Sequence, residues 1–523
     1  MQASTASLSV GLTDLVLLEC SRRHDSPLSP PICARLSSLL RSHLLQAAGR
    51  QLALVVDHLA DLEPGQWAGG WIITYAVSVV NLICFLILAA IGFFPDALTS
   101  RGREPQLSAS FLELLAALED SWVLEHVGRT LLLLAPQAEL QLGDCYGPFV
   151  MMVSCLSHMC IQCTAAAAAT ATATAAAATA ASTAAATAST TASSTATVAS
   201  RLRHLLSGRC LRHAVLASGV VGLCAADGGP DYGLPGGLRA GLQRELNALE
   251  TADMAVRSVL LLLRAQTVEP PQQGRSGGLA FAPRAGAAAL QRLQLQPGTG
   301  GGVDDLAVSV VESLLAAMQL LPSSPPASSQ EHWLADRESW WQLAGGACAA
   351  ASWLPPSWLE ALGELLAVGL LDTCDNGSAD PSDLPPAPAP KVAAALRGGA
   401  LACLERLMRC AGREPQGPHA DVLRVLVLSR KGHLWRCLAP LLAYGDPHRA
   451  AALVATVGKL LRLVAAQGPG ALRQKLHAKS NWDHIVAESD MVTDAAVAHG
   501  PLVRVLAVEA EGLWGRGGSV RCT

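Results

Sequence analysis

Amphipathic runs of about 10 to 20 residues, separated by short breaks at Gly, Pro or Asp, recur along most of this 523-residue chain. The best-defined run has Asp446 as its N-cap candidate and Pro447 at its first helical position, and it ends at Gly468. Its apolar residues share one helical face: Leu453, Val457, Leu460, Leu461 and Val464. Alternating β-type patterns are rare, so the sequence predicts an all-α protein.

Composition narrows the classes of partner. Lys and Arg number 38 against 42 Asp and Glu, a formal charge of −4, so there is no excess of cations to neutralise a phosphate backbone. We therefore expect protein partners and no nucleic acid. The 15 cysteines follow no regular spacing, and the chain opens without a signal-peptide pattern, which favours reduced thiols and a cytoplasmic protein.

One segment differs from its surroundings. Residues 71–94 read WIITYAVSVVNLICFLILAAIGFF, an uncharged stretch long enough to cross roughly 30 Å of hydrocarbon as a helix. Aromatic residues lie near both of its ends, as in transmembrane helices. Arg101 and Arg103 follow it, and this weak charge asymmetry would put its C-terminal side in the cytoplasm. The segment is therefore a candidate membrane anchor.

Two other interpretations of residues 71–94 stay open. Five of the chain's eight isoleucines and three of its six phenylalanines lie there, a bias that a retained intron or another spurious insert would also produce. A helix that is apolar on all sides can also be the buried central helix of a large helical core.

Composition divides the chain into alternating helical and low-complexity parts. Residues 164–199 contain only Ala, Thr, Ser and one Val, without an apolar stripe wide enough to pack, so we expect a linker. The predicted parts are an N-terminal helical region (1–66), the candidate transmembrane or buried helix (67–96), a helical region (97–163), the Ala/Thr linker (164–199), helical hairpins (200–267), a Gly/Pro-rich linker (268–302) and a C-terminal helical domain (303–523).

Helix lengths and turns follow a recognisable order in two places. Residues 237–250 and 252–266 are predicted to form a hairpin with its turn at Thr251. Farther along, a long helix (391–411), two short runs (419–430 and 433–444) and the helix after Pro447 follow one another in a three-helix rhythm.

This C-terminal rhythm resembles the armadillo/HEAT class of α-solenoids. The resemblance implies irregular helical repeats that stack in succession and bind other proteins along their ridged surface. An irregular helical domain without true repeats is the alternative.

A cluster of cysteines is the only candidate metal site. Cys155, Cys160 and Cys163, with His158 between them, have the spacing that begins a plant-type [2Fe–2S] motif. Their neighbours are typical of a helix rather than of a Gly-rich loop, so free thiols are the favoured interpretation, and we expect no cofactor.

Two further groups of residues are candidate partner-binding sites. The first is a basic cluster near residue 200, formed by Arg201, Arg203, Arg209 and Arg212. It could bind an acidic partner protein, a phosphate group or an anionic membrane, or it could simply be a solvated surface. The second is a tryptophan cluster that includes Trp340 and Trp341. Tryptophans are frequent in binding grooves, but a core between neighbouring helices uses them as well.

The chain carries no P-loop, no H-E-x-x-H zinc motif and no kinase H-R-D or D-F-G motif. The sequence therefore predicts a non-enzymatic helical scaffold for protein–protein interactions. A single-pass membrane-anchored adaptor is one alternative. The armadillo-like regulatory part of a kinase-type signalling enzyme, without its catalytic domain, is another.

Overall fold

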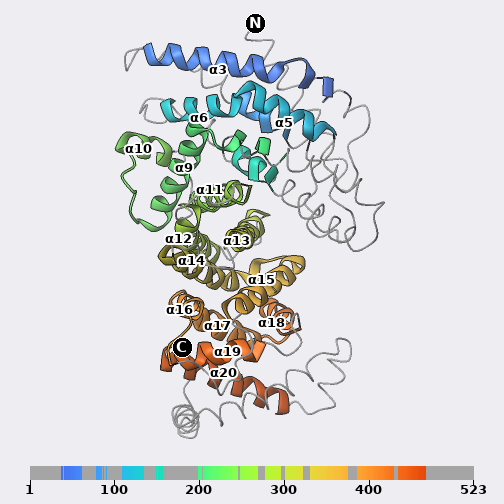
Figure 1. The fold of residues 1–523 in the computed structure, drawn as a ribbon, viewed down its shortest axis with the longest axis vertical. Helices are drawn as coiled ribbons and strands as arrows, with labels where there is room; N and C mark the ends of the chain where they lie inside the picture. The colour runs from blue at the N-terminus through green and yellow to red at the C-terminus, as the bar shows by residue number, and fades with distance from the viewer. Residues whose placement is uncertain are drawn as a thin grey trace. The chain divides into compact units, whose positions relative to one another are not determined.

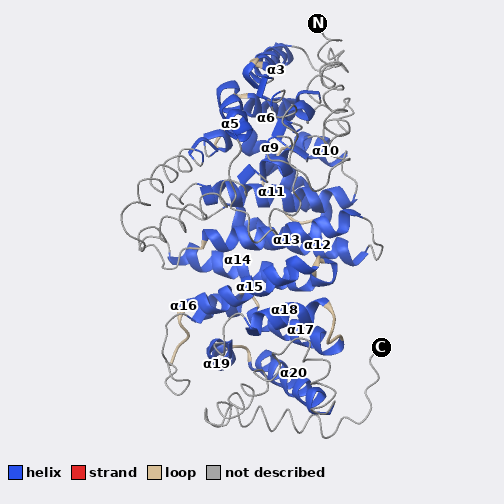
Figure 2. Cartoon of the chain, turned by 90° about the vertical axis from the view of Figure 1, so that its right-hand side faces the viewer, coloured by secondary structure: helices blue, strands red, loops and turns tan. Residues whose placement is uncertain are grey.

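The structure is a computed structural model of the chain. Of the residues it describes, 89% are helical and none lies in a strand, so the all-α prediction is confirmed (Figure 2). The described residues are 34, 37–38, 40–61, 78–84, 86–87, 90, 109–134, 149, 151–157, 159–160, 198, 200–202, 204–244, 248–268, 277–295, 301–321, 330–374, 386–428 and 434–466.

The chain forms two compact units, Met1–Gln272 (unit 1) and Gln273–Thr523 (unit 2). The boundary falls within the predicted linker 268–302. Parts predicted as separate regions between residues 1 and 267 contribute to one hydrophobic core in unit 1. The main helices of unit 1 are α3 (Leu44–Asp61), α5 (Ala109–Ser121), α6 (Val123–Leu134), α9 (Arg209–Asp227), α10 (Gly236–Arg244) and α11 (Ala248–Val268) (Figure 1).

Helix α9 is central to the packing of unit 1. It packs against α6, α10 and α11, while α3 packs against α5 and α6. The partner face of α6 carries Val123, Val127 and Leu131, which recur every four residues and are buried. Within the described residues, α9 is also the one helix long and apolar enough to cross a membrane.

The candidate membrane segment 71–94 is described in part, at residues 78–84, 86–87 and 90, all of them helical. Its buried side chains belong to the unit 1 core: Val79, Val80, Ile83, Cys84, Leu86, Ile87 and Ala90. A helix that is apolar on several sides is expected where neighbours surround it. This packing favours the buried-helix interpretation for the described part of the segment.

Unit 2 is a succession of helices, and most of them pack against a helix that lies two or three elements earlier or later in the chain. Helix α14 packs against α12 and α17, α17 packs against α20, and α15 packs against α13 and α18. Its elements are α12 (Gly277–Leu295), α13 (Gly301–Leu320), α14 (Gln330–Ala349), the 3₁₀ helix η1 (Ala351–Trp353), α15 (Pro356–Cys374), α16 (Pro390–Arg397), α17 (Ala400–Arg413), α18 (Pro418–Leu428), α19 (Leu434–Tyr444) and α20 (Pro447–Ala466).

Helix α12 corrects the prediction that 268–302 is a linker. Gly and Pro make up 12 of its 35 residues, yet residues 277–295 are helical with Pro283 inside the helix. The buried face consists of small and apolar side chains: Leu279, Ala282, Ala285, Ala288, Ala289 and Leu293. Because these side chains are small, α12 packs closely against α14, and a Cβ placed on Gly286 would lie 2.7 Å from Leu343.

Two predicted helix boundaries were also wrong. The predicted helix 391–411 is two helices, α16 and α17, because Gly399 takes a left-handed φ of 86° that favours glycine. The adjacent Gly398 packs tightly on α14, where an added Cβ would lie 2.6 Å from the Glu338 carbonyl oxygen. The turn predicted at Thr251 lies inside α11.

Other predicted parts are described only partly. Of the Ala/Thr tract 164–199, only Val198 is described; it is helical and buried. The C-terminal domain predicted for 303–523 is described as far as residue 466, and the remainder lies outside the described residues.

Candidate functional site

The candidate site lies where the turn between α5 and α6 meets the start of α9. Trp122 is the single residue between the two helices; its side chain is 53% exposed and its φ is +51°. A left-handed backbone costs roughly 1–2 kcal/mol for a residue with a Cβ. Bulky residues rarely adopt it, so the position is unusual.

Local hydrogen bonds hold Trp122 in this conformation. Its carbonyl oxygen accepts the backbone N–H of Glu125 at 3.0 Å and that of His126 at 3.1 Å, which starts α6. The Ser121 hydroxyl donates to the Leu118 carbonyl and accepts the Val123 N–H. The turn is therefore rigid, and its indole projects toward solvent.

His204 contacts this indole, and Glu119 links His204 to Arg201 of the predicted basic cluster. The His204 ring meets the Trp122 ring edge-on, with centroids 5.4 Å apart. Glu119 lies 3.6 Å from the Arg201 guanidinium and 3.5 Å from His204 Nδ1. We call Glu119, Trp122, Arg201 and His204 the Trp122 surface.

The first turn of α9 is tied to the same place through Glu125. Its carboxylate accepts the backbone N–H of Cys210 at 2.8 Å and of Leu211 at 3.2 Å. Gly128 allows this close approach, because an added Cβ would lie 2.6 Å from the Leu211 nitrogen. Glu125 thus caps α9 from another helix and satisfies two of its free donors.

Arg209 and Arg212 project from the first turns of α9 and are exposed. Among the described residues, no carboxylate forms an ion pair with either of them. Cations at a helix N-terminus are disfavoured by the helix dipole, so these arginines do not serve the stability of α9. They therefore add exposed positive charge to the start of α9, the helix that Glu125 of α6 caps.

The cap on α9 gives a stability prediction. Glu125→Gln keeps the shape but removes the charge and one acceptor, so we expect unit 1 to lose about 1–2 kcal/mol of unfolding free energy. Urea unfolding measures the loss of unfolding free energy, and hydrogen exchange of the α9 amides shows whether the loss lies in that helix. Asp120→Asn, an exposed carboxylate on α5, is the control and should change stability by less than about 0.5 kcal/mol. Equal effects of the two variants would contradict a capping role.

The structure places the predicted partner-binding residues in different settings. Arg201, Arg209 and Arg212 are exposed, whereas Arg203 lies outside the described residues. Trp340 and Trp341 are buried and meet edge-on, with ring centroids 4.9 Å apart. Their indole N–H groups donate within unit 2, to the Leu314 carbonyl and the Thr373 hydroxyl respectively. These two tryptophans lie in the unit 2 core, the alternative to a binding groove that the sequence left open for this cluster.

The candidate metal ligands are described in part. Cys155 and Cys160 are buried, while His158 and Cys163 lie outside the described residues. Burial raises the pKa of Cys160 to about 12, so this sulfur is a neutral thiol in the metal-free protein. Within the described part of the chain, no three His, Cys, Asp or Glu side chains gather as a metal site would require.

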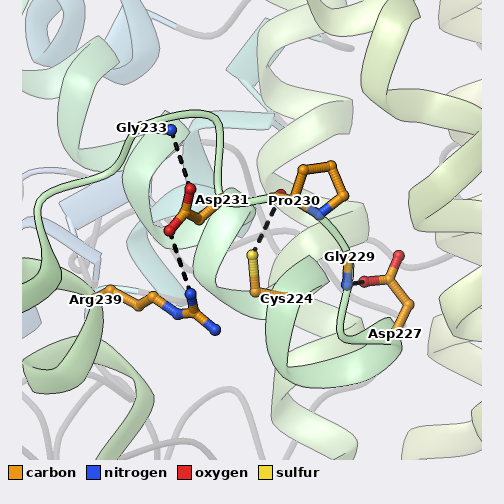
Figure 3. Close-up of polar contacts among 7 residues, drawn as sticks. All are labelled: Cys224, Asp227, Gly229, Pro230, Asp231, Gly233 and Arg239. Atoms are coloured by element: carbon orange, nitrogen blue, oxygen red, sulfur yellow. Dashed lines mark hydrogen bonds and ion pairs between the residues drawn. The ribbon is translucent and has the colours of Figure 1, made fainter.

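A second exposed aromatic residue, Tyr232, lies at the other end of α9. Its φ is +55° and its side chain is 57% exposed. Figure 3 shows how the loop before α10 is held: Asp227 accepts the Gly229 N–H at 2.8 Å, and Asp231 accepts from both Gly233 and Arg239. Tyr232 is therefore also exposed on a loop held by hydrogen bonds. Its neighbour Asp231 is already paired with Arg239.

Sequence reasoning missed both Trp122 and Tyr232. A Gly-Gly-Pro-Asp turn signal precedes Tyr232 and could have marked its loop. Trp122 has no such signal, because its exposure depends on how α5 and α6 pack. Comparisons of the chain with protein-family models, with curated proteins and with solved structures find no match.

Proposed function

We propose that this protein is a non-enzymatic helical scaffold that binds an acidic segment of a partner protein at the Trp122 surface and the adjoining arginines of α9. The observation that carries the proposal is an exposed tryptophan held in a costly backbone conformation, edge-on to His204, which shares the Glu119 carboxylate with the exposed Arg201. Exposed Trp and Arg side chains are frequent anchors of protein interfaces. Charge complementarity favours an acidic partner.

An armadillo/HEAT-like repeat organisation is part of this proposal. It is supported by the packing in unit 2, where α12, α14, α17 and α20 follow one another in contact, as do α13, α15 and α18. Two rows of successive helices are what stacked repeats produce. The short helix α16, followed by α17 and α18, matches a three-helix repeat.

A membrane-anchored adaptor is the alternative that the packing disfavours. To span a bilayer, residues 71–94 would have to withdraw Ile83, Leu86 and Ile87 from the unit 1 core. A cytoplasmic location therefore belongs to the proposal.

Selection from a random peptide library on the immobilised full-length protein tests the proposed function. Selected peptides should be rich in Asp and Glu around an apolar residue, and their affinity should fall steeply with salt because the contacts are ionic. Selection of peptides without an acidic excess would refute it.

Two matched variants tie the binding to the surface. Trp122→Gly and Tyr232→Gly each replace an exposed aromatic residue at positive φ with the residue best suited to it, so neither should lower stability. We expect Trp122→Gly to weaken peptide binding about 30-fold, the loss typical of a 2 kcal/mol anchor, and Tyr232→Gly to leave it unchanged. Peptide anisotropy measures both, and similar affinities for the two variants would contradict the assignment.

A further inference from the structure

Three pairs of free cysteines bring together helices that are distant in sequence. The Cys348 and Cys403 sulfurs lie 3.4 Å apart between α14 and α17. Cys84 and Cys155 lie within hydrogen-bonding reach of each other in unit 1. In the third pair, Cys374 at the end of α15 donates its S–H to the carbonyl oxygen of Cys437 in α19 at 3.2 Å, and the two thiols are also hydrogen-bonding neighbours.

We propose that Cys374 and Cys437 form an oxidative modification site, a dithiol pair that a small hydroperoxide converts to a disulfide between α15 and α19. Two helices that already pack against each other would then be joined covalently. The site has nothing to do with the Trp122 surface, which lies in unit 1.

Access distinguishes this pair from the other two. Cys374 is partly exposed, whereas Cys437 and all four cysteines of the other pairs are buried. A pair in which solvent reaches one of the two sulfurs is open to a small oxidant, while a pair with both sulfurs in a core is not. Cys374 is therefore the route by which an oxidant reaches the pair.

The electrostatics of the pair favour one order of reaction. Hydrogen bonding from the Cys374 thiol lowers the pKa of Cys437 and raises that of Cys374. Cys437 is thus the more easily ionised of the two thiols, so we expect it to attack first and Cys374 to be the resolving thiol. In the Cys348–Cys403 pair, hydrogen bonding to Cys403 and burial raise the pKa of Cys348, which keeps that sulfur protonated and unreactive.

The reaction balances with the hydroperoxide as the only oxidant. The Cys437 sulfur attacks one peroxide oxygen, the O–O bond breaks, and the other oxygen leaves as hydroxide and takes up a proton to become water. Cys437 is then a sulfenic acid. The Cys374 sulfur displaces its hydroxyl group, which leaves as water with the Cys374 proton, and the S–S bond forms. Two thiols are oxidised and one hydrogen peroxide becomes two waters.

Peptide mapping of the full-length, pre-reduced protein after brief exposure to hydrogen peroxide tests the proposal. Trypsin releases Cys437 in peptide 437–449, Cys403 in peptide 398–406, and both Cys374 and Cys348 in peptide 338–391. We expect 338–391 joined to 437–449 to form at least tenfold faster than 338–391 joined to 398–406. Equal rates, or first formation of any other cross-link, would overturn the proposal.

Single variants separate the two roles. In Cys374→Ser, Cys437 should accumulate as a sulfenic acid that a dimedone probe traps, because its resolving partner is absent. In Cys437→Ser, the same peroxide exposure should leave Cys374 largely unlabelled. Cys348→Ser is the control and should form the 374–437 disulfide at the wild-type rate. Labelling of Cys374 in Cys437→Ser as fast as that of Cys437 in Cys374→Ser would contradict the assigned order.

Discussion

Gly369→Ala is expected to lower the unfolding free energy of unit 2 by about 2 kcal/mol. Gly369 lies in α15 directly under the indole of Trp340, and an added methyl would overlap the ring. The ring has little room to move, because it is 1% exposed, its Nε1 donates to Leu314 and it meets Trp341 edge-on. Overpacking of this kind costs up to about 3 kcal/mol, and the better helix propensity of Ala returns about 1 kcal/mol.

Gly345→Ala is the matched control for this prediction. Gly345 also lies inside a helix of unit 2, α14, but an added Cβ meets no atom within 4 Å. Only the propensity gain remains, so this variant should stabilise unit 2 by about 0.5–1 kcal/mol. Urea midpoints, with hydrogen exchange in α14 and α15, report both changes. The same sign for both variants would show that Trp340 yields to the methyl.

Asp372→Ala is expected to destabilise unit 2 by about 3 kcal/mol. The Asp372 carboxylate forms ion pairs with Arg337 of α14 and, at 3.0 Å, with Lys391 of α16. The Arg337 side chain is 5% exposed and its guanidinium lies 4.4 Å from the Trp333 ring. Burial lowers the pKa of Arg337 to about 10, so its charge is costly there and depends on the carboxylate beside it. Removal of one partner from such a pair costs about 3–5 kcal/mol, reduced here because Asp372 is partly exposed.

The exposed pair Arg397–Glu338 is the control for Asp372→Ala. The two side chains are 51% and 31% exposed, and their closest N···O distance is 3.0 Å. Glu338→Ala should therefore cost less than about 1 kcal/mol. Chemical unfolding of both variants at low salt makes the comparison. If Asp372→Ala lowers the unfolding free energy no more than Glu338→Ala does, the Arg337–Asp372–Lys391 network does not hold α14, α15 and α16 together.

Helix ends that depend on local chemistry were predictable from the sequence. Asp446 was predicted as the N-cap of a helix starting at Pro447, and α20 does start there, with the Asp446 carboxylate accepting the Arg449 N–H at 3.0 Å. The cap uses residues within one turn of each other, so the sequence contains the whole interaction.

Helix α12 and the break at Gly399 show why other elements were not predictable. Residues 277–295 contain six Ala and four Leu, but the Gly and Pro residues around them and Pro283 within them favoured a linker, and close packing on α14 holds the helix. The break after α16 uses a glycine pair that fits tightly against α14. Both outcomes depend on a neighbour more than 30 residues away, which propensities do not include.

The candidate site divides in the same way. Arg201, Arg209 and Arg212 stand out in the sequence as a basic cluster, but their role required Trp122, which lies 79 residues or more before them. The tryptophans that did stand out, Trp340 and Trp341, are buried. The residue type determines which contacts a side chain can make, whereas its exposure in the folded protein determines whether a partner can reach it.

Helix periodicity, end signals and charge are properties of neighbouring residues, and from them alone follow the all-α class, the best-capped helices and the position of the basic cluster. Burial and long-range pairing arise only when distant helices meet. The packing of Ile83, Leu86 and Ile87 in the unit 1 core, the exposure of Trp122, the Arg337–Asp372–Lys391 network and the pairing of Cys374 with Cys437 therefore became visible only in the folded chain.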